Sequence, residues 1–216
     1  RIGELTERIG TLSGQLGASW QGERSTTSLR FNRWDTEQNY LLPAPPDGAG
    51  IGIRLENSEL QLRNDRDISL GGSQWTLSPT LSWQNNLRRA NKPGNPRSGL
   101  FDGDIEIEFD QYTLRVEASH DDEDALSSGT LGFEVRYLDQ ESSGRTVLVP
   151  GGTTRAAGLF AYEQRHFGLL LLQAGIRYDH LDIEADADKT AGATGFDGRV
   201  GNDYDVFSGA LGGSYP

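Results

Sequence analysis

The sequence has 216 residues, a formal net charge of −12, 28 glycines and neither cysteine nor methionine. Without cysteine the chain has no disulfide, no thiolate metal site and no cysteine nucleophile, and the acidic balance argues against an extended nucleic-acid-binding surface. Its longest aliphatic run, residues 169–172, is far shorter than the roughly 20 apolar residues that a transmembrane helix needs.

Apolar and polar residues alternate with a period of two in nine stretches, and this pattern predicts extended strands with two different faces. In chain order the predicted strands cover residues 10–21, 26–33, 51–66, 75–83, 104–120, 130–139, 155–164, 169–182 and 204–215. No helical period competes with them. The sequence therefore predicts an all-β protein.

Two of these stretches change the parity of their apolar positions. In residues 51–66 the apolar positions move from Ile53 and Leu55 to Leu60 and Leu62, which predicts a β-bulge near Asn57. Residues 104–120 show a similar change. A bulge would return the later apolar residues to the same face as the earlier ones.

The connections between the predicted strands alternate between short and long. The long ones are rich in Pro, Gly or acidic residues and cover residues 34–50, 88–103, 140–153 and 183–202. Outer-membrane barrels have short periplasmic turns and long extracellular loops, and their tilted strands need about 9–11 residues to cross the bilayer. We therefore predict an antiparallel transmembrane β-barrel segment of about nine strands. A soluble secreted β-sandwich is the alternative, and the absence of a fixed repeat disfavours a solenoid.

Residues 144–180 resemble part of the TonB-dependent outer-membrane receptors. The stretch LFAYE, a tight turn and LQAGIRYDH follow one another there, as in that family. Residues 16–43, 53–65 and 205–215 are similar to neighbouring family segments in the same order. The resemblance covers most of the chain.

The resemblance implies a 22-stranded barrel filled by an N-terminal plug domain, which takes up a scarce nutrient with energy from the inner-membrane TonB complex. We expect residues 1–216 to be a partial barrel domain, with the plug and the remaining strands absent. The expected partners are outer-membrane lipid, lipopolysaccharide, the TonB complex and a small nutrient ligand, with no cofactor and no nucleic acid. The expected location is the outer membrane of a Gram-negative bacterium. Siderophore, metal complex, vitamin and sugar all remain open as substrates.

A passive porin and a barrel enzyme remain as alternative functions. An enzyme needs a convergent catalytic set, which the sequence does not contain, and we interpret Asp179 and His180 as wall residues. The acidic positions Asp182, Glu184, Asp186 and Asp188 alternate, so they share one face and could hold a hard cation. A solvated loop is the simpler interpretation, and the same holds for residues 120–124. We predict no catalytic or metal site.

Two sets of residues are predicted to lie on opposite faces of the barrel wall, one at the membrane interfaces and one in the lumen. Aromatic residues at the ends of apolar stripes are predicted to anchor the membrane interfaces, with ordinary sheet residues as the alternative; they are Trp20, Trp75, Trp83, Tyr137, Tyr178 and Tyr215. Inward charged residues are predicted to pair across strands in the lumen or to contact a plug; they are Arg30, Glu134, Arg136, Arg177 and Asp179.

Overall fold

The computed structural model describes residues 9–41, 50–70, 73–90, 104–122, 126–145, 147, 149–186 and 199–215. These residues form nine strands and contain no helix long and apolar enough to cross a bilayer. The strands are β1 (Ile9–Gln21), β2 (Ser25–Leu41), β3 (Gly50–Leu70), β4 (Ser73–Ala90), β5 (Ile105–Asp122), β6 (Ser127–Ser143), β7 (Gly152–Phe167), β8 (Leu170–Asp186) and β9 (Arg199–Ser214).

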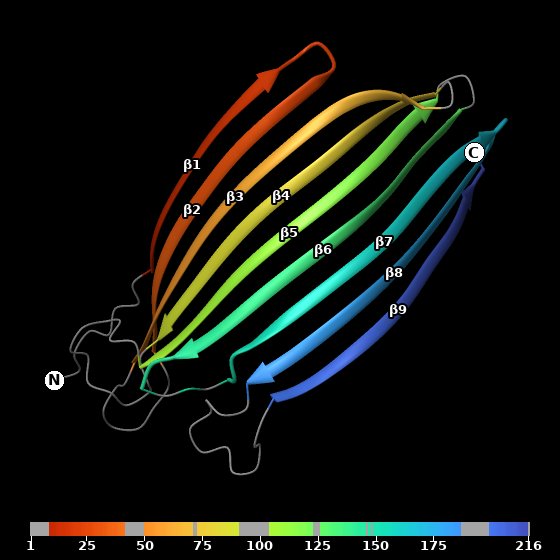
Figure 1. Cartoon of the computed structure of the whole chain (residues 1–216). Coiled ribbons are helices and arrows are strands. Elements are labelled where there is room, and N and C mark those ends of the chain that lie inside the picture. The colour runs from red at the N-terminus through yellow and green to blue at the C-terminus, as the bar shows by residue number, and fades with distance from the viewer. Residues whose placement is uncertain are drawn as a thin grey trace.

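All nine strands lie in one antiparallel sheet in chain order, from β1 at one edge to β9 at the other (Figure 1). This order places the short connections together at one end of the sheet and the long ones at the other. The turn between β7 and β8 has only Gly168 and Leu169 between its strands, and Gly168 has a φ of 63°. A two-residue hairpin needs such positive φ values, which glycine adopts without steric cost. The predicted all-β fold and its rhythm of short and long connections are confirmed.

The strands are longer than predicted, ranging from 13 residues in β1 to 21 in β3. Parts of the predicted loops 34–50 and 88–103 belong to strands, because β2 continues to Leu41, β3 begins at Gly50 and β4 continues to Ala90. Residues 42–49 and 91–103 lie outside the described residues. The extensions carry many charged residues, so they lack the apolar alternation by which strands are recognised. The strands thus extend well beyond the roughly 9–11 residues of a bilayer crossing.

The predicted β-bulge near Asn57 is wrong. Asn57 pairs directly with Trp34 on β2 and Asn86 on β4, and the register is the same on both sides of it. The register of β5 against β4 is also constant from Ile105 to His120. The strands are therefore continuous, and their apolar residues change from one face of the sheet to the other along the strand.

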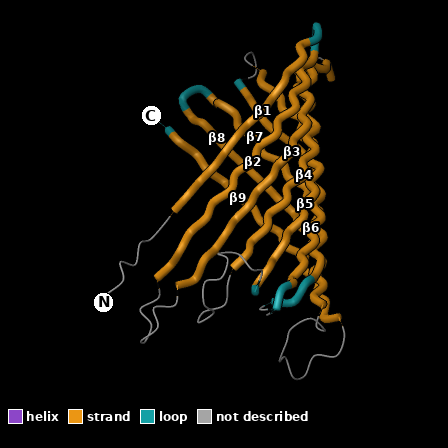
Figure 2. The backbone as a smooth tube through the Cα atoms, turned by 90° about the vertical axis from the view of Figure 1, so that its left-hand side faces the viewer, coloured by secondary structure: helices purple, strands orange, loops and turns teal. Residues whose placement is uncertain are grey.

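The sheet is curved and twisted rather than flat (Figures 1 and 2). In β6 and β8 exposure alternates residue by residue, with apolar side chains such as Leu131, Phe133 and Ile176 exposed and their polar neighbours half-buried. Side chains on the concave side of a curved sheet crowd one another and lose exposure. We therefore assign the polar face of these strands as the concave face and the apolar face as the convex one.

The polarity of the two faces is reversed near the long connections. There the concave face carries a small apolar cluster of Ile53, Ala90, Ile105, Ile107 and Phe109, of which Ala90, Ile105 and Ile107 are buried. The alternate positions on the convex face carry charged residues. The convex apolar band is therefore limited to the middle and the short-turn end of the sheet, and a strongly polar region lies beyond it.

Candidate functional site

The concave face of β5 to β8 brings two arginines over one aromatic ring. The guanidinium carbon of Arg115 lies 4.9 Å from the centroid of the Phe160 ring, and that of Arg177 lies 5.7 Å from it. A cation within about 6 Å of a ring centroid is attracted by the electron density of the ring face. β5, β7 and β8 thus jointly position two cations on the wall.

Each arginine is held by a carboxylate two residues further along its own strand, because residues two apart project from the same face. Arg177 donates to both oxygens of Asp179 at 2.7 and 2.6 Å. Arg115 donates to Glu117 at 2.7 Å and to Glu134 on β6 at 3.3 Å. These side chains are partly exposed, so each pair is expected to contribute only about 0.2–1 kcal/mol to stability. Their main effect is to fix the direction of the guanidinium groups.

Two glycines make room for this cluster. A Cβ atom on Gly132 would lie 2.6 Å from Cζ of Phe160, and one on Gly158 would lie 2.5 Å from Oδ1 of Asp179. Either contact would force the neighbouring side chain to move. Glycine at both positions therefore lets the Phe160 ring and the Asp179 carboxylate lie flat against the sheet.

A hollow of about 330 Å³ adjoins the cluster, and its lining includes Glu134, Arg136, Arg177 and Asp179. Four of the five charged residues predicted to face inward thus come together on one part of the concave face. Arg30 lies on β2, paired with Gly17 and Gln61, and belongs to a different part of the sheet. The arrangement offers charges of both signs to whatever lies inside the curved sheet.

Arg115, Glu117 and Phe160 were not predicted from the sequence. One signal was available for the first two: Arg115 and Glu117 repeat the Arg-x-acid spacing of Arg177 and Asp179 at inward positions. Phe160 gave no such signal, because an isolated aromatic residue at an inward position does not reveal which cations surround it.

Aromatic residues form a row across the convex face where the apolar band meets the polar region. Trp83, Tyr112 and Tyr137 are direct cross-strand neighbours on β4, β5 and β6, and Tyr112 had not been singled out from the sequence. The Trp83 indole N–H donates to Asp110 at 3.0 Å. Each of these rings thus has an apolar body on the band and lies next to polar groups, as interface aromatics do.

The segment that carries the RYDH sequence reaches the same polar boundary further along the sheet. The Tyr178 hydroxyl donates to Asp205 on β9 at 2.7 Å, and Nδ1 of His180 lies 2.9 Å from the same carboxylate oxygen. Asp205 therefore ties both side chains of β8 to the neighbouring strand.

The other three predicted anchors lie at the short-turn end of the sheet. Trp75 packs against His120 with ring centroids 4.6 Å apart, and Nε2 of His120 lies 3.0 Å from a Glu163 oxygen. Trp20 and Tyr215 are strongly exposed. The six predicted aromatic residues thus divide into two groups of three, one in the middle of the strands and one at their short-turn end.

A network of ion pairs covers the convex face beyond the aromatic row. Arg33 pairs with Glu56 at 3.0 Å, and Arg89 pairs with Glu106 at 2.7 Å and with Glu56 at 3.3 Å. Arg54 lies among the same carboxylates, 3.2 Å from Glu56. These contacts link β2, β3, β4 and β5 and explain why the charged extensions remain paired as strands.

Within the described ranges, no three His, Cys, Asp or Glu side chains are grouped so that they could hold a metal ion. Asp182, Glu184 and Asp186 occupy alternate positions on β8, which continues to Asp186 where the sequence predicted a loop. Asp188 lies outside the described residues, as do residues 123 and 124 of the other acidic stretch. His120 lies on β5.

The comparisons with known proteins agree with this architecture. The family described as "TonB dependent receptor-like, beta-barrel" matches residues 11–216. A solved structure, "Copper transporter OprC", superposes with a TM-score of 0.68 at 14% sequence identity, over 97% of this chain and 34% of that one. No curated protein sequence matches. The chain spans about a third of the solved transporter, and at this identity the likeness concerns the fold alone. Because the family match covers nearly the whole chain, the protein belongs to the TonB-dependent receptor-like β-barrel family.

Proposed function

We propose that this chain forms part of the wall of an outer-membrane receptor that takes up a small, scarce nutrient with energy from the inner-membrane TonB complex. The observation that carries the proposal is the two-faced sheet. Its convex apolar side chains are exposed over the width of a band, whereas its concave face is charged. A lipid-facing exterior and an aqueous interior require this arrangement.

The open edges of the sheet support a larger barrel. In the described structure β1 pairs only with β2, and β9 pairs only with β8. Unpaired edge strands expose backbone N–H and C=O groups, which the bilayer core does not tolerate. We therefore propose that further strands close the barrel, so that residues 1–216 form a partial barrel domain.

The Arg115–Phe160–Arg177 cluster is proposed to line the interior of that barrel. Its cations are held in fixed directions by Asp179, Glu117 and Glu134 rather than left free to sample many conformers. A rigid, mixed-charge wall suits docking of an internal plug domain or transient contact with a polar nutrient. The same wall gives no preference among siderophore, metal complex, vitamin and sugar.

Lipopolysaccharide is the proposed partner of the ion-pair network beyond the aromatic row. Acidic residues outnumber basic ones there; the convex positions are Asp35, Glu37, Glu56, Glu106, Glu108 and Asp110 against Arg33, Arg54 and Arg89. Arginines can bind lipopolysaccharide phosphates directly, and the surplus carboxylates can bind divalent cations that bridge to further phosphates. This assigns the long connections to the extracellular side.

Energised uptake is tested with the full-length protein in its own cells. The gene is deleted, and growth is compared on limiting siderophore–iron complexes, free metals, vitamins and sugars, with and without a functional TonB complex. Loss of growth on one nutrient, restored by the intact gene only when TonB is present, supports the receptor. Restoration without TonB indicates a passive porin. Fractionation should place the protein in the outer membrane as a heat-modifiable band, and recovery in a soluble fraction refutes the membrane assignment.

A further inference from the structure

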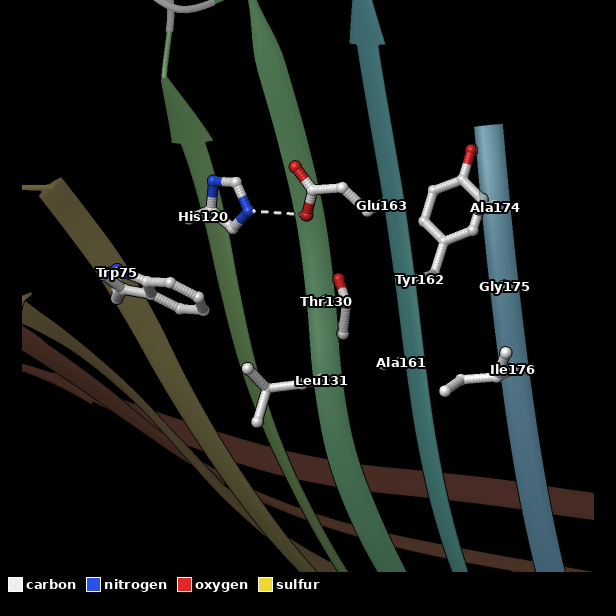
Figure 3. Close-up of a pocket in the computed structure, with 10 residues that line it drawn as sticks. All are labelled: Trp75, His120, Thr130, Leu131, Ala161, Tyr162, Glu163, Ala174, Gly175 and Ile176. Atoms are coloured by element: carbon white, nitrogen blue, oxygen red, sulfur yellow. Dashed lines mark hydrogen bonds and ion pairs between the residues drawn. The ribbon is translucent and has the colours of Figure 1, made fainter. Parts of the chain in front are cut away.

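The convex face has a hollow at its short-turn end that the proposed transport does not use. Its volume is about 270 Å³. Trp75, Leu131 and Ile176 give it large apolar walls (Figure 3). General contact between the convex apolar band and lipid does not require such a hollow.

Small residues create this hollow on an otherwise ridged surface. Ala161 on β7 lies between the larger Leu131 on β6 and Ile176 on β8, and Ala174 lies two residues before Ile176 beside Glu163; all four apolar residues line the same space. Leu131 and Ile176 remain about half exposed, so the hollow opens outward rather than into the sheet. It is shaped to receive a slender apolar group that arrives from the bilayer.

A polar rim closes the end of the hollow nearest the short turns. His120 and Glu163 contact each other across β6, with Nε2 and Oε2 3.0 Å apart, and Trp75 packs against the His120 ring (Figure 3). The pair passes directly over Gly129, where a Cβ atom would overlap the Glu163 carboxylate and lie 2.8 Å from Nε2 of His120. Glycine at this position therefore permits the rim.

The rim carries both signs of charge in a fixed order. The Glu163 side chain is about half exposed. Arg165 follows two residues later on the same face of β7, which places its Cα about 7 Å further along the strand. Its guanidinium lies 5.5 Å from the ring of Phe167. The Glu163 carboxylate thus lines the apolar hollow, and the Arg165 guanidinium lies beyond it, on the side of the short turn.

We propose that this groove binds one phosphatidylethanolamine molecule from the inner leaflet of the outer membrane. An acyl chain lies between Leu131 and Ile176, and the phosphate meets Arg165 beyond the rim. The ethanolamine arm folds back from the phosphate, so that its ammonium group meets the Glu163 carboxylate. Charge complementarity selects this lipid, because phosphatidylglycerol has no ammonium group that could join His120 as a second partner of Glu163, and its phosphate is repelled by that carboxylate. The inference rests on the proposed outer-membrane location and orientation.

The test uses the full-length receptor extracted from its own outer membrane in mild detergent. Native mass spectrometry then counts retained lipids, and the protein is re-equilibrated in vesicles of phosphatidylethanolamine, phosphatidylglycerol or a mixture of the two. We expect one retained phosphatidylethanolamine per receptor. Ala174→Leu fills the hollow with an apolar side chain that bulk lipid tolerates, and should lower retention about tenfold, equivalent to about 1.4 kcal/mol of binding free energy.

Two control variants separate the groove from general lipid contact. Ala157→Leu makes the same change on the convex face of β7 outside the groove and should leave retention unchanged. Glu163→Gln should remove the preference for phosphatidylethanolamine over phosphatidylglycerol, whereas Glu141→Gln, at the opposite end of the sheet, should keep it.

Equal retention in Ala174→Leu and Ala157→Leu overturns the groove proposal, as does the absence of any retained lipid or an equal preference for both lipids. These results leave the transport function intact if the receptor fractionates with the outer membrane. A receptor that does not enter the outer membrane overturns both proposals.

Discussion

Replacing Phe133 by arginine provides the most direct test of the two-faced sheet. Phe133 is an exposed residue on the convex face of β6 and pairs with Val116 and Leu159, which are also apolar. It lies four residues from Tyr137, in the aromatic row, and four residues from Gly129, under the polar rim. At about 3.4 Å per residue these eight residues span about 27 Å along the strand. A tilt of about 45° reduces this to about 19 Å across the bilayer, so Phe133 lies near the midplane.

The cost of the substitution follows from this depth. An arginine on the lipid face of a barrel costs about 2–4 kcal/mol at the midplane and about 0–1 kcal/mol near an interface. We therefore expect Phe133→Arg to lower the free energy of unfolding by about 2–4 kcal/mol. Leu172→Arg should cost less, because Leu172 pairs with Arg165, at the inner end of the band.

The full-length receptor in phospholipid vesicles is unfolded reversibly with guanidinium. Loss of its heat-modifiable band on a gel reports the unfolded fraction. Gln173→Arg is the matched control, because Gln173 is a half-buried residue of the concave face directly beside Leu172. It should be tolerated with little loss of stability. If Phe133→Arg and Gln173→Arg have equal effects, the assignment of the convex face to lipid is refuted.

Three further predictions concern other parts of the sheet. Gly168→Ala places a Cβ at a φ of 63° in the β7–β8 turn. It should destabilise the receptor by about 1–2 kcal/mol in the same unfolding assay. An unchanged unfolding midpoint would show that the turn can adopt another conformation. Gly158→Val should displace the Asp179 carboxylate and reduce TonB-dependent uptake while the receptor still reaches the outer membrane; uptake equal to that of the unmodified protein would exclude a role for the cluster. Arg89→Ala should lower the amount of lipopolysaccharide that copurifies with the receptor, and chelation of divalent cations by EDTA should lower it further; retention that responds to neither change would contradict the proposed contact.

The number and kind of elements could be read from the chain because their signals are local. Period-two alternation and clusters of turn-forming residues lie within a few positions of each other, so nine strands and the rhythm of their connections were predicted correctly. The placement of Arg177 and Asp179 together on the polar, concave face followed from the same alternation, since the parity of β8 is clear from Leu172 to Tyr178.

The limits of the strands and the make-up of the wall depended on contacts between distant residues. Arg33 and Glu56 are 23 positions apart, and pairs of this kind explain why β2 continues through a charged stretch that sequence alone assigns to a loop. The exchange of polarity at Asn57 imitates a bulge in one strand and is distinguished from it only by the register against both neighbours. Phe160 could not be recognised either, because Arg115 reaches its ring from a strand that is not adjacent to β7. Local patterns thus determined that the chain forms two-faced strands, whereas register and curvature decided which residues of different strands meet.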